Sequence, residues 1–169
     1  EARLERLVSA LDSLAAGHDR RIVMSTHPRT RRRLARLARK TKGVARSRVE
    51  FLKPFGFFDW ITLQRHAACV LSDSGTLTEE AALLGFPAVM IRDAHERPEG
   101  MDAGVTVMSG VSPERVLQAV ELAMAQGAPA GGEARVPDYE DRDVSRKVVR
   151  IILSYVDYVQ RTTWFRPGA

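Results

Sequence analysis

Short apolar runs along this chain alternate with longer segments in which apolar residues recur every three or four positions. The short runs predict five strands, at 21–25, 49–52, 69–71, 88–91 and 106–108. The longer segments predict helices over 2–15, 29–40, 57–66, 76–84, 112–126 and 144–159. A polar stretch rich in Gly and Pro, 127–143, predicts a long loop. Because strands and helices alternate, we expect an α/β fold with a parallel sheet covered on both faces.

Length and composition are those of one sizeable globular domain, and we treat residues 1–169 as a single domain. A single cysteine excludes an internal disulfide and fits a reducing cytoplasm. No apolar run approaches the roughly 20 residues of a membrane span, so we expect no membrane partner. The first residues have the pattern of a helix interior, which predicts that the chain is a fragment of a longer protein.

Positive charge gathers in the first part of the chain. Residues 1–50 hold 14 Lys and Arg against 5 Asp and Glu, and most of this excess lies in the predicted helix 29–40. A nucleic-acid site would need aromatic side chains between the basic ones or an accompanying motif, and neither is present. We therefore expect a solvated helix face and no nucleic-acid partner.

A polar loop follows the predicted strand 69–71 and leads into the helix 76–84. At a helix start, backbone N–H groups lack partners within the helix and attract anions, so Ser74, Gly75 and Thr76 could bind a phosphate. Asp73 or Ser74 could instead simply cap the helix. In the next turn, Glu79 and Glu80 either hold ribose hydroxyls or stabilise the helix dipole.

Other polar residues give weaker indications of chemistry. His27 follows a strand, where it serves as either a nucleotide contact or a structural histidine. Asp93 and His95 have no zinc-ligand spacing, and we expect no metal site. Cys69 lies in an apolar strand, which predicts a buried, unreactive thiol.

Two neighbouring motifs carry a family resemblance. Residues 72–76 with 79–81 (Ser-Asp-Ser-Gly-Thr and Glu-Glu-Ala) and then 92–100 (Arg-Asp-Ala-His-Glu-Arg-Pro-Glu-Gly) resemble the non-hydrolysing UDP-N-acetylglucosamine 2-epimerases, in residues and in spacing. Within that family, Thr76 and the segments 56–60 and 148–155 resemble the branch that forms UDP-N-acetyl-L-fucosamine for capsule and O-antigen synthesis.

The resemblance implies a Rossmann-like, C-terminal UDP-binding half of a glycosyltransferase-B-type enzyme of two domains. It assigns Ser74, Gly75, Thr76 and Arg97 to the diphosphate and Glu80 to the ribose. It also places Trp60 beside the uracil and allows Phe55 a contact through its backbone only. A loop that contains His27 would lie near the nucleotide. From these residues alone, Trp60 could be a core residue and Arg97 could pair with Glu96 or Glu99.

The implied reaction removes the proton at sugar C2, expels UDP and adds UDP back with inversion at C2. The implied substrate is UDP-2-acetamido-2,6-dideoxy-L-talose; UDP-GlcNAc with UDP-ManNAc is the alternative, and a noncatalytic nucleotide-binding or glycosyltransferase module is a further one. No cofactor is implied. The catalytic acids and bases would lie in the enzyme's own N-terminal domain, so we expect the fragment to be inactive. We expect the last helix to be exposed or to pack in a homodimer.

Overall fold

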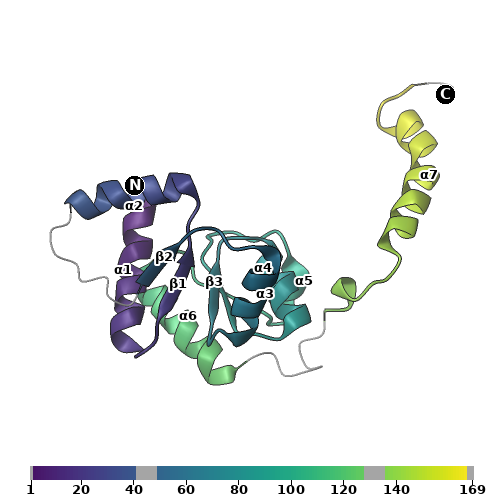
Figure 1. Cartoon of the computed structure of the whole chain (residues 1–169). Coiled ribbons are helices and arrows are strands. Elements are labelled where there is room, and N and C mark those ends of the chain that lie inside the picture. Colours follow the sequence, from purple (N-terminus) through teal and green to yellow (C-terminus); the bar gives the residue numbers. More distant parts are fainter. Residues whose placement is uncertain (1, 41–48, 128–135, 167–169) are drawn as a thin grey trace. The chain divides into compact units, whose positions relative to one another are not determined.

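The computed structural model describes residues 2–40, 49–127 and 136–166, and they divide into two compact units, 1–136 and 137–169 (Figure 1). Unit 1 begins with helix α1 (Ala2–Gly17), strand β1 (Ile22–Ser25), helix α2 (Pro28–Lys40) and strand β2 (Val49–Leu52). It continues with α3 (Phe57–His66), β3 (Val70–Ser72), α4 (Thr76–Leu84), β4 (Ala88–Met90), α5 (Pro98–Asp102), β5 (Val107–Met108) and α6 (Pro113–Gln126). Unit 2 holds a short 3₁₀ turn (Pro137–Tyr139) and α7 (Val144–Thr162).

All the strand pairs of the described chain are parallel, as the alternating pattern predicted. β1 pairs with β2, and β4 lies between β3 and β5 in a second sheet. No ladder joins the two sheets in the part of the chain that the structure describes, so the strands form two parallel sheets where the sequence predicted one.

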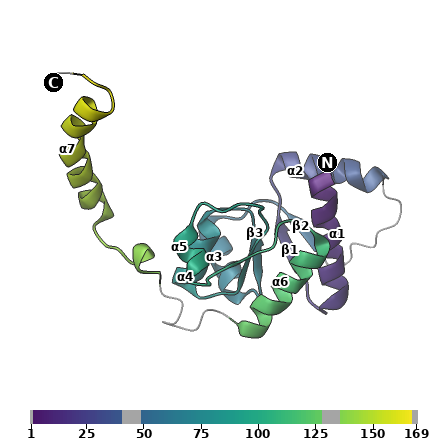
Figure 2. The same cartoon turned by 180° about the vertical axis from the view of Figure 1, so that it is seen from behind.

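Helices cover both faces of the three-stranded sheet (Figure 1 and Figure 2). α3, α4 and α5 lie on one side, and α1 and α6 lie on the other. α1 and α6 share one apolar core with β2 and β4, built around residues such as Ala10, Val49, Val89 and Val116. This core connects the β1–β2 pair to the rest of unit 1.

Most element boundaries fall within one or two residues of those predicted, although α7 ends at Thr162, three residues beyond its predicted end. Two segments differ in kind. The short helix α5 lies in a stretch that the sequence indicated only as charged; Pro98 at its first position is the signal that marks it. The 3₁₀ turn 137–139 falls in the predicted loop 127–143, of which residues 128–135 lie outside the described residues.

Helix α6 begins within one residue of the predicted place, without a side-chain cap on its backbone. Ser112 is the N-cap, yet its hydroxyl donates a hydrogen bond to Glu114 Oε2 at 2.6 Å and makes no cap hydrogen bond to the backbone. This hydrogen bond lowers the pKa of the exposed Glu114 carboxyl.

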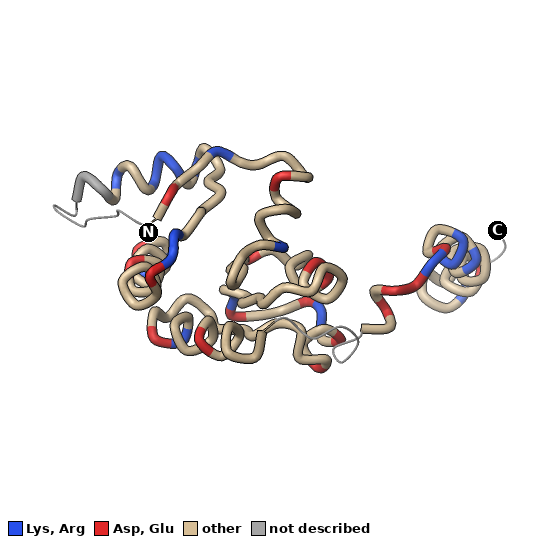
Figure 3. The backbone as a smooth tube through the Cα atoms, turned by 60° about the horizontal axis from the view of Figure 1, so that its bottom comes forward, with Lys and Arg blue, Asp and Glu red and all other residues tan. Residues whose placement is uncertain are grey.

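The basic face of α2 is exposed, as predicted for a solvated helix surface. Figure 3 shows Lys and Arg along this helix, and the side chains of Arg29, Arg31, Arg32, Arg33 and Arg36 are exposed while Leu34 is buried.

Candidate functional site

The register of the second sheet brings three loops to one edge. Ser72 pairs with Met90, and Met90 with Met108, so β3, β4 and β5 end at the same level. The backbone continues this alignment, because Ile91 N donates to Ser72 O and Ser109 N donates to Met90 O, both at 3.0 Å. The loops after the three strands therefore lie side by side at the carboxyl edge, where open α/β sheets bind their ligands.

The loop after β3 forms the start of α4 without a side-chain cap. Gly75 is the N-cap residue and no side chain makes a cap hydrogen bond, so the alternative in which Asp73 or Ser74 caps the helix is wrong. Ser74 N instead donates to Ser72 Oγ at 3.0 Å, and the hydroxyls of Ser74 and Thr76 lie 2.9 Å apart. Within the described residues, the amides of Gly75 and Thr76 have no acceptor. Two unpaired N–H groups and two hydroxyls can thus bind an anion at this helix end.

Arg97 reaches this loop from the segment after β4. Its Nε donates to Glu79 Oε1 at 2.5 Å, and both side chains are only partly exposed. A Cβ on residue 75 would lie 2.3 Å from Arg97 Nη1, so the guanidinium rests directly against the Gly75 backbone. Glu96, which the sequence suggested as a possible partner of Arg97, pairs with Arg92, with Arg92 Nη2 and Glu96 Oε1 3.1 Å apart. The result is a guanidinium, paired with Glu79, beside the free amides of the α4 start.

The two consecutive carboxylates of α4 have different partners. Glu79 binds Arg97, whereas Glu80 accepts a hydrogen bond from the side-chain amide of Gln64 on α3. Gln64 is 2% exposed. Gln64 was not predicted as a site residue, although its position four residues after Trp60 on α3 is the spacing that places both on one helix face.

The two predicted aromatic residues lie together. The rings of Phe55 and Trp60 are nearly parallel, with centroids 6.2 Å apart and an interplanar angle of 16°. Both side chains are partly exposed, so Trp60 is not a core residue. A base stacked on such a pair would gain from the same offset geometry that aromatic side chains prefer.

His27 belongs to the other sheet and follows β1. It is exposed, and its Nδ1 accepts a hydrogen bond from Arg29 N at 3.3 Å at the start of α2. Within the described chain, the recorded contacts do not connect His27 to the residues after β3 and β4. This hydrogen bond gives His27 a local contact at the start of α2, and its predicted contact with a nucleotide stays a prediction.

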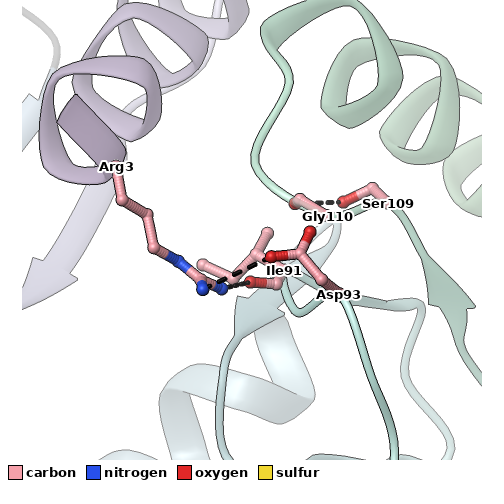
Figure 4. Close-up of polar contacts among 5 residues, drawn as sticks. All are labelled: Arg3, Ile91, Asp93, Ser109 and Gly110. Carbon is pink, nitrogen blue, oxygen red and sulfur yellow. Dashed lines mark hydrogen bonds and ion pairs between the residues drawn. The ribbon is translucent and has the colours of Figure 1, made fainter.

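Helix α1 is tied to the carboxyl edge by Arg3 (Figure 4). Its guanidinium donates to Ile91 O at 3.1 Å and lies 3.4 Å from Asp93 Oδ2, just after β4. On the other side of Asp93, a Cβ on Gly110 would lie 2.8 Å from Oδ1, and the backbone there has φ +67°. These contacts place the segment that leads to Arg97 between α1 and the loop after β5.

Other reactive groups in the described chain do not form a second centre. Cys69 directly precedes β3 and is partly buried, where a buried strand residue was predicted. Burial raises the pKa of its thiol to about 12, which keeps the thiol protonated at neutral pH and fits the predicted lack of reactivity. Within the described residues, His, Cys, Asp and Glu side chains do not gather in a group of three that could bind a metal ion. In the described part of the chain, no helix is both long enough and apolar enough to cross a membrane.

Comparison with known proteins identifies the family. The family described as UDP-N-acetylglucosamine 2-epimerase matches residues 1–153. This chain belongs to the UDP-N-acetylglucosamine 2-epimerase family. A UDP-N-acetylglucosamine 2-epimerase of Methanocaldococcus jannaschii is 32% identical over 120 residues, which cover 71% of this chain and 33% of that protein.

Solved structures of epimerases in this family share the fold. The structure of UDP-N-acetylglucosamine 2-epimerase from Rickettsia bellii aligns with 98% of this chain and 44% of its own, with 48% identity and a TM-score of 0.81. The Methanocaldococcus jannaschii enzyme in complex with UDP-GlcNAc and UDP aligns with 90% of this chain and 41% of its own, with 28% identity and a TM-score of 0.71. The chain thus spans less than half the length of these epimerases.

Proposed function

We propose that residues 1–169 form the C-terminal, UDP-binding domain of a nucleotide-sugar 2-epimerase that acts in the cytoplasm. The observation that carries this proposal is the cluster at the carboxyl edge, where Arg97 lies against Gly75 beside the unpaired amides of Gly75 and Thr76. A guanidinium and backbone N–H groups are the donors that recognise a diphosphate. The Methanocaldococcus jannaschii relative was solved with UDP-GlcNAc and UDP, which supports a ligand of this class.

Each part of UDP then has a partner in this chain. The diphosphate contacts Ser74, Gly75, Thr76 and Arg97, and the ribose hydroxyls donate to Glu80. The uracil lies near the Phe55–Trp60 pair, with the Phe55 backbone as its polar contact. His27, which follows β1, would approach the nucleotide from the side of that strand.

In the reaction that the family resemblance implies, a base removes the proton at C2 of the sugar while UDP leaves C1. This chain contributes by stabilising the negative charge that develops on the departing diphosphate, through Arg97 and the amides at the α4 start. UDP then adds back after the proton has returned to the opposite face of C2. The groups that move this proton would come from an N-terminal domain of the same enzyme.

For the substrate, we propose UDP-2-acetamido-2,6-dideoxy-L-talose, converted to UDP-N-acetyl-L-fucosamine for capsule or O-antigen synthesis. The support for this choice is the resemblance of Thr76 and of the segments 56–60 and 148–155 to that branch of the family. The names of the relatives favour UDP-GlcNAc and UDP-ManNAc as the second candidate pair. Assay of the full-length enzyme on both UDP-sugars separates these candidates: faster turnover of UDP-GlcNAc would overturn the first.

A calorimetric titration of the 169-residue chain with UDP tests the binding site, with UMP as the comparison ligand. We expect saturable UDP binding that is stronger than UMP binding, because UMP lacks the second phosphate. Arg97→Ala should weaken UDP binding at least about tenfold, since a charged hydrogen bond is worth about 1.5–3 kcal/mol. Arg115→Ala is the matched control, because it removes the same charge from an exposed position on α6.

Two outcomes would contradict the proposal. An absence of UDP binding at millimolar concentration would mean that this cluster is not a UDP site in the isolated chain, as would be expected of a noncatalytic interaction domain. Equal losses of UDP affinity in Arg97→Ala and Arg115→Ala would show that Arg97 contributes only general electrostatic attraction. Amide shifts confined to residues 74–80 and 97 would support the site directly.

A further inference from the structure

The side-chain amide of Gln64 is buried in a place where the fold gives it few partners. Gln64 is 2% exposed, and its neighbours on α3, Leu63 and Arg65, are both exposed. A buried amide without a hydrogen bond is costly, so such a group is normally kept only with a defined partner. In the described structure that partner is the carboxylate of Glu80, and Gln64 Oε1 has none.

The hydrogen bond fixes one oxygen of Glu80 and leaves the other available. Gln64 Nε2 donates to Oε2, and the described structure records no other hydrogen bond of the Glu80 side chain. A carboxylate has about four acceptor positions, so Glu80 can still accept hydrogen bonds from two hydroxyl groups. Glu79 differs in its partner, because its Oε1 pairs with the Arg97 guanidinium. Glu80 is therefore the carboxylate of this pair that is held by a neutral donor, Gln64, and is not in an ion pair with Arg97.

We propose that Gln64 is a positioning residue, which orients the Glu80 carboxylate toward the 2′,3′-diol of a ribonucleotide. The inference rests on the proposed UDP site and adds to it the residue that selects ribose over deoxyribose. Glutamate side chains have three rotatable bonds, and fixing them before the ligand arrives lowers the ordering cost of binding. Gln64 acts through Glu80 and does not itself contact the nucleotide.

The test compares UDP with 2′-deoxy-UDP by calorimetry on the whole chain. We expect the unmodified chain to prefer UDP by about 10- to 100-fold, the range for a hydrogen bond to a charged group. Gln64→Met keeps the length and volume of the side chain but removes the donor, and should bring this preference toward about threefold. Binding of 2′-deoxy-UDP, which keeps only the 3′-hydroxyl, should weaken less than binding of UDP. Glu80→Gln should lose the preference too, and the double variant should be no worse than Glu80→Gln alone.

A matched control separates this role from loss of core stability. Thr106 is another buried polar residue, 5% exposed, and it precedes β5 at the opposite end of that strand from the loop edge. Thr106→Val should alter the thermal midpoint without changing the ratio of the two nucleotide affinities. Should Gln64→Met fail to fold, the side-chain amide resonance of Gln64 in the unmodified chain provides the readout. That resonance should shift when UDP binds and should not shift in Glu80→Gln.

The outcomes distinguish this inference from the proposed function. A chain that binds UDP, with the ribose preference intact in Gln64→Met and lost in Glu80→Gln, would overturn the role of Gln64 and leave the UDP site standing. A chain that does not bind UDP would overturn both. A preference lost in both variants and retained in Thr106→Val supports the positioning role.

Discussion

Gly75 and Arg97 show how a single missing side chain can create a binding position. The Gly75 backbone has φ −63° and ψ −31°, a helical conformation that any residue can adopt. The requirement for glycine therefore comes from space, because a Cβ would lie 2.3 Å from Arg97 Nη1. Nη1 is at the flexible end of the long Arg97 side chain and can move away. Replacing Gly75 by a larger residue should therefore change the binding site more than the fold.

We expect Gly75→Ala to displace the Arg97 guanidinium and weaken UDP binding by about tenfold or more, the value of one charged hydrogen bond. The free energy of unfolding should change by less than about 1 kcal/mol, since Gly75 has helical φ and ψ, a backbone conformation that suits alanine. Calorimetry and urea unfolding measure the two effects on the same sample. Unchanged UDP affinity in Gly75→Ala would show that the close packing of Arg97 on Gly75 has no part in binding.

Residues in one loop could be predicted from sequence, whereas partners from distant segments could not. Ser74, Gly75 and Thr76 are neighbours in the chain, and a strand followed by a helix is enough to bring them to a helix start. The pairing of Glu79 with Arg97 spans 18 residues, and that of Gln64 with Glu80 spans 16. No local spacing rule reaches this far, because such pairs depend on how α3, α4 and the segment after β4 pack.

At the scale of elements, α4 is the helix that presents the site, and its two ends are built differently. Its start has no side-chain cap, which leaves amides unpaired for a ligand. Its end has Gly85 in the left-handed conformation, with φ +67°, and the Gly85 amide donates to Ala81 O at 2.9 Å. Both ends were placed correctly from sequence, because Gly and Pro are strong local signals. The predicted strand 69–71 was one residue early, since an apolar run does not mark where a short ladder begins.

We expect Gly85→Ala to lower the free energy of unfolding by about 1–2 kcal/mol, the cost of a left-handed backbone with a Cβ. Nothing lies within 4 Å of the added Cβ, so the effect isolates backbone strain. Gly17→Ala at the end of α1 is the matched control; its surroundings are equally open, its φ lies outside the left-handed range, and it should be neutral or slightly stabilising. Urea unfolding of both variants gives the comparison, and equal effects at the two positions would contradict the strain argument.

At the scale of the whole molecule, the two units differ in how their apolar side chains are placed: unit 1 buries them in a core, whereas helix α7 of unit 2 exposes them. The apolar core cluster lies within unit 1, from Ala10 to Ala123. Helix α7 of unit 2 has no buried residue, although it carries a long series of exposed apolar side chains, Val148, Val149, Ile151, Ile152, Leu153, Tyr155 and Val156. The sequence pattern predicted this amphipathic helix, but a pattern alone does not identify what its apolar face contacts.

We propose that this chain binds UDP and that an N-terminal domain carries out the proton transfer, so we expect this chain to bind without turnover. The described loop edge offers donors for a leaving diphosphate, while of its two α4 carboxylates Glu79 pairs with Arg97 and Glu80, held by Gln64, is the one we assign to the ribose. Epimerisation also requires groups that remove and return the proton at C2, which we assign to the part of the epimerases that this chain does not cover. We therefore expect the purified chain to bind UDP and the UDP-sugar but to leave the sugar unchanged.

Incubation in D₂O followed by NMR is a sensitive measurement, because any C2 proton transfer would replace hydrogen by deuterium even without net conversion. The full-length enzyme under the same conditions is the positive control. Deuterium at C2 with the 169-residue chain alone would show that it contains a competent base, and would move the catalytic groups into this domain.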